Sequence, residues 1–331
     1  MSGSDTPELA AAVSNAGGLG SFGAARTGPD ELRATIRRIR QLTDRPFGIN
    51  LFAWNALDVA EADATAVVAA LSPLYEELGV GAPDARVPFD PHAFLEEQLA
   101  VVAEERVPVF SFTFGVPPLD EVRASGAVVA GTATTADEAA ALEEAGVDLI
   151  VAQGSEAGGH RGTFLHDFED ALIGGIALVP AVVDRVGVPV LVAGGISDGR
   201  GVAAALALGA DGAQIGTVFL RCPESAAAAV HKTLVAEQSR PTTVTDRYTG
   251  RPARAFRTRV ADELARAGVN ALPYPLQQVV TEPIRRAAVE QGREDVAIAL
   301  AGQGQPRSTP VGASDLLGAL VAETEKALAR L

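Results

Sequence analysis

Apolar segments of strand length alternate with helical segments along most of the chain, and this alternation constrains the fold more than any other feature. The apolar segments lie near 19–23, 47–51, 108–114, 127–132, 148–153, 189–194 and 212–216. Between them, apolar residues recur at helical spacing, as at 135–145 and 197–208. Because strands that alternate with helices form a parallel sheet with right-handed crossovers, we predict an α/β protein.

The number of strands indicates which parallel fold this is. A closed (β/α)8 barrel needs eight strands, and the segments above provide seven. The chain opens on a helix, since Thr6 suits an N-cap and Pro7 the first helical position. The missing strand would therefore be the first. We predict a (β/α)8 TIM barrel that lacks its first strand, with a doubly wound open sheet as the alternative.

The ends of the last two strands favour the barrel. Ala193-Gly-Gly-Ile-Ser-Asp-Gly199 is a glycine turn that leads into a helix, and Gln214-Ile-Gly-Thr217 sets a glycine beside a hydroxyl group. In TIM barrels, the loops after strands seven and eight often hold a phosphate against a helix N-terminus. These residues predict a phosphate site. The alternative is that Gly194-Gly195 makes only a tight turn.

A second glycine pattern has a different interpretation. Gly18-Leu-Gly-Ser-Phe-Gly23 matches G-x-G-x-x-G, the fingerprint of dinucleotide-binding proteins. That fingerprint follows a strand and opens a helix, whereas this segment follows the helix that begins near Thr6. We interpret it as a short strand with its turn, and we expect neither FAD nor NAD as the tight cofactor.

The loop Gln153–Gly162, with the sequence Gln-Gly-Ser-Glu-Ala-Gly-Gly-His-Arg-Gly, is the strongest candidate for a functional site. It follows Gly146–Ala152, an apolar run typical of a strand buried on both faces. Its four glycines let the backbone approach a flat or charged group closely. His160 lies in this loop, where a solvated histidine is the alternative interpretation. Arg161 could stabilise negative charge or pair with an acid such as Glu156.

Composition excludes several classes of protein. The net charge of −15 disfavours nucleic acid and anionic membranes as partners. No apolar stretch reaches the roughly 20 residues of a membrane span, and no apolar leader opens the chain. With the single Cys222 no intrachain disulfide can form, and we expect a cytoplasmic protein.

The positions of the lysines and histidines argue against three further kinds of site: a Schiff base, a P-loop and a metal centre. The only lysines, Lys232 and Lys326, lie in helical segments near the C-terminal end, so neither a Schiff base nor a P-loop is indicated. The histidines show no ligand-like pairing on a helix face, so we expect no metal. They are His92, His160, His166 and His231.

The segment 221–299 departs from the alternation of strands and helices. It contains proline-rich turns such as Leu272-Pro-Tyr-Pro-Leu276, with helices between them. We predict that 221–299 forms a smaller, mainly helical cap, and that 1–220 and 300–331 form the barrel. The loop Gly250-Arg-Pro-Ala-Arg254 is interpreted as a structural turn, with a position next to the substrate as the alternative.

These motifs together resemble the nitronate monooxygenase family, also called 2-nitropropane dioxygenases. The resemblance covers most of the chain in order. It is carried by Ala12–Gly20, Arg45–Leu51, Ser111–Gly115, Thr132–Thr135, Gln153–Gly162, Ala193–Ile196, Gly212–Thr217, Gly250–Arg254 and Ala301–Gln303. It implies an FMN-dependent TIM barrel with a smaller helical domain that covers the site.

The resemblance also implies roles for particular residues. His160 matches the family's catalytic histidine. Contacts to FMN are implied at Asn50, Gln153, Gly158, Gly195, Gln214, Ile215, Gly216 and Thr217. Among these, Gly195, Gly216 and Thr217 would hold the phosphate.

The activity implied by the resemblance is oxidation of alkyl nitronates, and possibly nitroalkanes, with O2 to a carbonyl compound and nitrite. A first alternative is an FMN-dependent enoyl-acyl carrier protein reductase, which has a similar Glu-Ala-Gly-Gly-His loop. That group typically has Glu at the place of Gln153 and an aliphatic residue at the place of Arg161. A second alternative is a degenerate flavin-binding barrel without activity.

The chain departs from the family's pattern at its first residues. Members begin with a strand that ends in a motif like Ala-Pro-Met, and here Met1 takes the place of that methionine. Unpaired backbone groups on the first and last strands would each cost about 1–3 kcal/mol where they are buried. We therefore expect an apolar strand of about 5–6 residues to be encoded just upstream of Met1, and the alternative is a barrel that closes without this strand.

Overall fold

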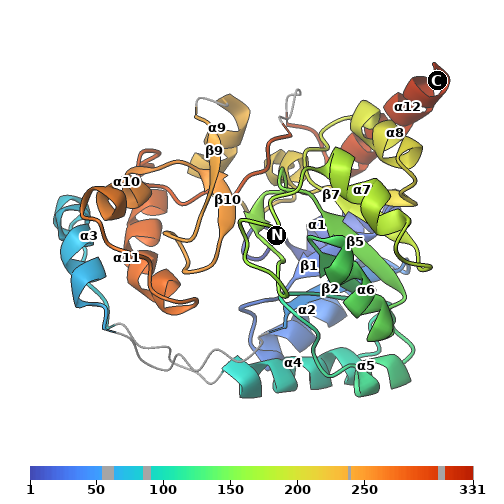
Figure 1. The fold of residues 1–331 in the computed structure, drawn as a ribbon, viewed down its shortest axis with the longest axis horizontal. Coiled ribbons are helices and arrows are strands. Elements are labelled where there is room, and N and C mark those ends of the chain that lie inside the picture. Colours follow the sequence, from blue (N-terminus) through green and yellow to red (C-terminus); the bar gives the residue numbers. More distant parts are fainter. Residues whose placement is uncertain (54–62, 85–90, 238–239, 305–309, 331) are drawn as a thin grey trace.

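A seven-stranded parallel sheet, curled and surrounded by helices, forms the larger part of the molecule (Figure 1). The computed structural model describes residues 1–53, 63–84, 91–237, 240–304 and 310–330. The strands are β1 (Gly20–Gly23), β2 (Phe47–Phe52), β3 (Val109–Thr113), β4 (Val128–Ala133), β5 (Leu149–Gln153), β7 (Val190–Ala193) and β8 (Gly212–Gln214). They pair in sequence order from β1 to β8. A doubly wound sheet would reverse its order, so the predicted TIM barrel lacking one strand is confirmed.

Helices cover the outside of this sheet (Figure 1). They are α1 (Pro7–Asn15), α2 (Pro29–Leu42), α4 (Pro91–Glu104), α5 (Asp120–Ala124), α6 (Ala136–Glu144), α7 (Gly175–Val183), α8 (Gly199–Ala207) and α12 (Ala313–Leu328). Local chemistry sets where several begin. The Thr6 hydroxyl accepts a hydrogen bond from the Leu9 N–H at 2.9 Å, and the Asp198 carboxylate accepts from Arg200 N at 3.0 Å.

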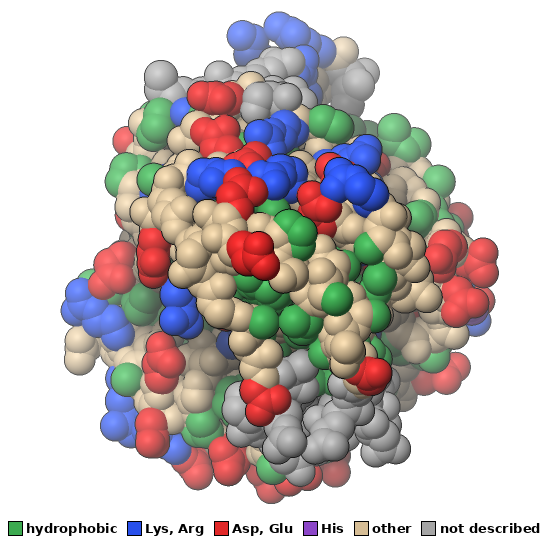
Figure 2. Space-filling model, turned by 90° about the vertical axis from the view of Figure 1, so that its left-hand side faces the viewer, with side chains coloured by type: hydrophobic (Ala, Val, Ile, Leu, Met, Phe, Trp, Pro, Cys, Tyr) green, Lys and Arg blue, Asp and Glu red, His purple; other side chains and the backbone are tan. Residues whose placement is uncertain are grey.

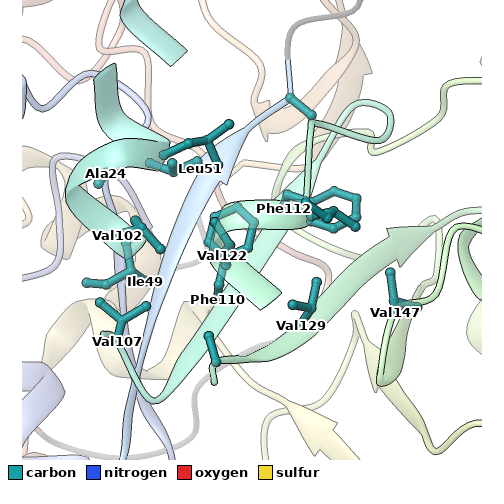
Figure 3. Close-up of a cluster of buried hydrophobic side chains, with 14 of the residues drawn as sticks. Ala24, Ile49, Leu51, Val102, Val107, Phe110, Phe112, Val122, Val129 and Val147 are labelled. Carbon is teal, nitrogen blue, oxygen red and sulfur yellow. The ribbon is translucent and has the colours of Figure 1, made fainter. Parts of the chain in front are cut away.

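The core of the barrel lies between its strands and these helices. Figure 3 shows Ile49 and Phe110, from β2 and β3, beside Val102 of α4 and Val122 of α5. All four side chains are fully buried or nearly so. Strands buried on both faces read as continuous apolar runs, which is why the sequence pattern located them.

Gly20 shows why a glycine-rich strand follows the first helix. A Cβ atom at this position would lie 1.8 Å from the carbonyl oxygen of Ala10, so α1 packs directly on the backbone of β1. The segment Gly18–Gly23 thus consists of a turn and the strand β1, and it follows a helix. This arrangement confirms that the segment is not a dinucleotide fingerprint.

The outer edges of β1 and β8 face the place of the missing strand. No strand among the described residues pairs with either edge. Met1 lies between them, since a Cβ on Gly23 would be 3.0 Å from the Met1 nitrogen and one on Gly216 would be 3.6 Å from its Sδ. Asp5 closes the region, accepting from the Met1 ammonium at 3.2 Å and from the Gly23 N–H at 2.5 Å.

A second layer with its own core lies beside the barrel. It contains α9 (Ala229–Glu237), α10 (Arg259–Arg266) and α11 (Leu276–Glu290). A three-stranded antiparallel sheet adds β6 (Gly159–His160), β10 (Ala253–Phe256) and β9 (Thr242–Thr245), in that order. This small sheet was not predicted. Its strand β6 belongs to the Gln153–Gly162 loop, so the sheet connects that loop to the cap.

The cap also takes in chain from before residue 221. Helix α3 (Thr65–Leu78) buries Leu71, Leu74 and Tyr75 against α10 and α11. The expected division at residue 220 would leave this helix with the barrel, so we propose a cap formed by α3 together with 221–299. Part of the predicted helix 57–79 lies outside the described residues.

Charged side chains secure α3 on the outer face of the cap. Glu77 of α3 accepts from Arg259 at 2.7 Å and Arg293 at 2.5 Å, and Asp295 pairs with the same two arginines. Figure 2 shows acidic and basic side chains next to one another on this face. The two arginines lower the pKa of Glu77 to about 2.

No helix in the described part of the chain is long and apolar enough to cross a membrane.

Candidate active site

The predicted site residues gather at the carboxyl edge of the barrel. Asn50 lies near the end of β2, Gln153 ends β5 and Gln214 ends β8, while Gly195 follows β7. Carboxyl ends of parallel strands meet at one edge, so these positions share one face of the molecule. All eight expected cofactor-binding residues keep accessible surface, unlike the neighbouring core residues.

Gln153 holds the central loop in its folded shape. Its Nε2 donates to the carbonyl of His160 at 3.0 Å, and its Oε1 accepts from the N–H of Gly162 at 2.9 Å. Each end of the amide still has one hydrogen-bonding position left. Gln153 therefore fixes the loop that carries His160, and it keeps one donor and one acceptor for a cofactor.

Arg161 fills neither of the roles considered for it. It is 1% exposed, and its guanidinium donates to the carbonyls of Gly154, Gln153 and Ala171 at 2.7, 3.1 and 2.9 Å. Glu156, its expected partner, accepts instead from the Gly175 N–H. Arg161 thus stabilises the loop from its buried side. Burial lowers the pKa of its guanidinium to about 10.

His160 is surrounded by aromatic rings. Its ring centroid is 5.7 Å from Phe52, 5.7 Å from Phe114 and 5.5 Å from Tyr274, in each case with the rings near perpendicular. Edge-to-face contacts of this kind fix the orientation of a ring. Tyr274 comes from the predicted cap segment and Phe52 and Phe114 from the barrel, so His160 contacts rings from both parts of the chain.

Phe114 has a strained backbone. Its φ is +86°, in the left-handed region that a bulky side chain rarely adopts. Such strain concentrates at functional sites, where the surroundings hold it in place. Phe114 follows β3 directly and contacts Phe52 with ring centroids 4.3 Å apart. Its ring centroid also lies 5.7 Å from that of His160.

The surroundings of His160 keep it neutral. Burial among the rings lowers the pKa of its imidazole to about 3, and the positive charges of Arg251 and Arg26 lower it further. A neutral imidazole has a free lone pair and can accept a proton from a substrate.

Thr249 determines which nitrogen of His160 carries the proton. The Thr249 hydroxyl lies 2.9 Å from Nε2 of His160 and 3.1 Å from the carbonyl of Arg251. A carbonyl can only accept, so the single hydroxyl proton goes to Arg251 and the oxygen accepts from His160. We therefore assign Nε2–H to the neutral ring, which leaves the lone pair on Nδ1.

We predict that Thr249→Val lowers the rate of proton removal by His160 about fivefold, because one hydrogen bond of about 1 kcal/mol no longer holds the tautomer. Thr249→Ser keeps the hydroxyl and should retain most activity. Nitrogen-15 NMR of His160 measures the tautomer directly. Equal losses in the two variants, with the Nε2–H form intact in both, would rule out this role.

Glycines and a threonine shape the other end of the site. Gly194 and Gly195 follow β7 with φ of +120° and +72°, which favour glycine. Thr217 accepts from the N–H of Gly302 at 2.9 Å, so its own hydroxyl proton is free to donate. A Cβ on Gly158 would lie 2.4 Å from Gly302 N, so this glycine also lets the segment 301–304 pack closely.

Five site residues were missed from the sequence: Phe52, Phe114, Thr249, Arg251 and Tyr274. Phe114 and Arg251 lie in motifs that carried the family resemblance, and Tyr274 lies in the noted proline-rich turn. For Arg251, the sequence signal was the alternative interpretation of Gly250–Arg254 as a loop next to the substrate.

Within the described residues, no group of three or more His, Cys, Asp and Glu side chains could hold a metal ion.

The barrel and its carboxyl-edge site define a TIM-barrel enzyme. A family model described as Nitronate monooxygenase matches residues 1–323. The chain therefore belongs to the nitronate monooxygenase family and is an oxidoreductase, as the resemblance implied.

Several known proteins are similar over nearly the whole chain. A nitronate monooxygenase of Pseudomonas aeruginosa is 44% identical over 330 residues, 98% of this chain and 94% of that protein. A probable nitronate monooxygenase of Staphylococcus haemolyticus is 37% identical, over 99% of this chain and 93% of that protein.

Two solved structures share the fold. A nitroalkane oxidase from Streptomyces ansochromogenes has a TM-score of 0.91 and 37% identity, covering 99% of this chain and 94% of that one. FabK from Thermotoga maritima has a TM-score of 0.74 and 31% identity, covering 100% and 92%.

Proposed function

We propose that this protein oxidises alkyl nitronates, and nitroalkanes after removal of an α-proton, to a carbonyl compound and nitrite with O2, using FMN. The observation that carries the proposal is the neutral His160, oriented by Thr249 and three aromatic rings at the carboxyl edge. The names of the relatives, nitronate monooxygenase and nitroalkane oxidase, support the substrate class.

The residues at the barrel edge fit a flat cofactor with one phosphate. Gly195, Gly216 and Thr217 offer backbone groups and a free hydroxyl proton at neighbouring strand ends. Asn50 donates to the Ser111 hydroxyl at 2.9 Å, which leaves its carbonyl oxygen for the ring or ribityl chain. FMN, when bound, supplies the electron acceptor for a carbanion-like substrate.

His160 would act on the substrate as a general base. Its Nδ1 lone pair accepts the α-proton of a neutral nitroalkane, while Nε2–H stays bound to Thr249. The rings of Phe52, Phe114 and Tyr274 reduce the contact of the imidazole with water. A nitronate has already lost this proton, so it needs only binding and orientation.

The decisive experiment is an absorbance spectrum of the purified protein followed by anaerobic addition of a nitronate. Bleaching of a flavin spectrum by the nitronate supports the proposal. Bleaching by NADH alone would instead favour the enoyl-acyl carrier protein reductase alternative. A flavin spectrum that neither reagent changes would indicate a barrel without activity.

We predict that FMN binds through its phosphate at Thr217. Thr217→Val removes the hydroxyl that can donate to a phosphate oxygen, so FMN affinity should fall about tenfold or more, as expected for a hydrogen bond to a charged group. Riboflavin, which lacks the phosphate, should bind both proteins equally. Fluorescence titration of flavin-free protein measures these affinities. Riboflavin or FAD binding as tightly as FMN would contradict the single phosphate site.

A further inference from the structure

Arg251 lies beside His160 but has no role in the functions given above. Its guanidinium carbon is 3.8 Å from the centroid of the Phe114 ring. The Phe114 ring centroid in turn lies 5.7 Å from that of His160. The side chain is only partly buried. A positive charge therefore shares an aromatic neighbour with the proposed base.

The Arg251 guanidinium has hydrogen-bond donors to spare. Nε donates to the carbonyl of Arg161 at 3.4 Å, and Nη2 donates to the carbonyl of Thr163. A guanidinium carries five N–H groups in a planar fork, and Nη1 binds no residue in the described part of the chain. The two carbonyls hold the fork in place while at least Nη1 can donate to a ligand.

The charge of Arg251 has no ion-pair partner in direct contact among the described residues. No Asp or Glu among the described residues forms an ion pair with it, and burial lowers its pKa to about 10. A partly buried cation without a partner is less favourable than one whose opposite charge is brought by a ligand. The fork matches two oxygens on one atom, which is the geometry of a carboxylate or a nitronate.

We propose that Arg251 binds the two oxygens of the substrate's nitro group and selects the nitronate anion over the neutral nitroalkane. The proposal rests on the function proposed above and names the residue that gives that site its preference. Neutral His160 cannot supply a positive charge, and the Arg161 guanidinium is engaged by three carbonyls. Arg251 also stabilises the anion that forms when His160 removes the α-proton.

The test compares Arg251→Met and Arg251→Lys with the unchanged enzyme. Arg251→Met keeps an unbranched side chain over Phe114 but removes the charge, so KM for a nitronate should rise about 10- to 100-fold. KM for the neutral nitroalkane should change less than about threefold. Arg251→Lys keeps the charge without the fork and should give an intermediate KM for the nitronate.

Arg257→Met is the matched control. Arg257 lies on the exposed surface of the cap and pairs with Asp262 at 2.8 Å, so this variant loses the same charge away from the site. It should leave both KM values unchanged. Equal rises for nitronate and nitroalkane in Arg251→Met would show a structural role and overturn the proposal. If that variant does not fold, an unchanged nitronate KM in Arg251→Lys overturns it.

Binding of nitrate separates this proposal from the proposed function. Nitrate is a planar anion with oxygens on one nitrogen, and calorimetry on the purified protein measures its affinity without turnover. We expect binding that Arg251→Met weakens at least tenfold and Arg257→Met leaves unchanged. Such binding in a protein that oxidises no nitronate would refute the function but keep the anion site. Nitronate turnover with nitrate binding independent of Arg251 would refute the anion site alone.

Discussion

Replacing His160 with alanine is expected to lower turnover of neutral nitroalkanes by about 10²- to 10⁴-fold, the usual contribution of a general base. Turnover of pre-formed nitronates should fall much less, because these substrates carry no α-proton to remove. The measurement is kcat with each substrate form, in freshly prepared solutions. Equal losses on both forms would leave His160 with a binding role only.

The pH profile gives a second readout of the same residue. The pKa of His160 is lowered to about 3, so the imidazole is the neutral base at every pH above that value. As pH falls from 8 to 5, kcat/KM for the neutral nitroalkane should therefore show no loss near 6.5, the ordinary pKa of histidine. His166→Ala is the control and should leave this profile unchanged. It removes an exposed histidine whose Nε2 lies 3.8 Å from the exposed carboxylate of Asp137.

The barrel could be predicted from the sequence because its signals are local. Buried parallel strands are short apolar runs, and their polar ends fall at one edge whatever the details of packing. Asn50, Gln153 and Gln214, which the family resemblance implies as cofactor contacts, lie at or near such strand ends. The loop around His160 stood out through its glycines, which are required by the backbone at Gly159, with φ of +87°.

The cap side of the site could not be predicted because it depends on long-range pairing. Ala253 pairs with His160 across β10 and β6, and this places Thr249 and Arg251 near the imidazole. Strand β6 has two residues, too few for any periodicity to appear. The charge of Arg161 drew attention in the sequence, but this side chain is buried and its guanidinium donates to three carbonyls.

Glu138 holds the base of the active-site loop from the barrel. Its carboxylate is fully buried and accepts from the N–H and hydroxyl of Thr134 at 2.7 and 2.6 Å. It also accepts from the N–H groups of Phe164 and Leu165 at 2.5 and 3.1 Å. Thr163, just before them, supplies the carbonyl that binds Arg251. One carboxylate thus connects β4 and α6 to the segment that positions the guanidinium.

Glu138→Gln is therefore expected to destabilise the protein by about 3–5 kcal/mol, because a buried hydrogen-bonded charge is removed while its donors remain. Whichever way the amide turns, its NH2 group meets at least one backbone N–H, from Thr134 on one side or from Phe164 and Leu165 on the other. Urea titration and thermal unfolding measure the loss.

Asp137→Asn provides the matched comparison for Glu138→Gln, since it removes the same charge one residue earlier on α6. The Asp137 side chain is 71% exposed, and its carboxylate lies 3.8 Å from Nε2 of His166. Exposed pairs of this kind contribute about 0–1 kcal/mol, so this variant should unfold almost as the unchanged protein does. If Glu138→Gln folds, the loosened Thr163 carbonyl should also raise KM for nitronates through Arg251. Equal stability of the two variants would mean that other groups satisfy the donors around Glu138, and that the loop is held by Gln153 and Arg161 alone.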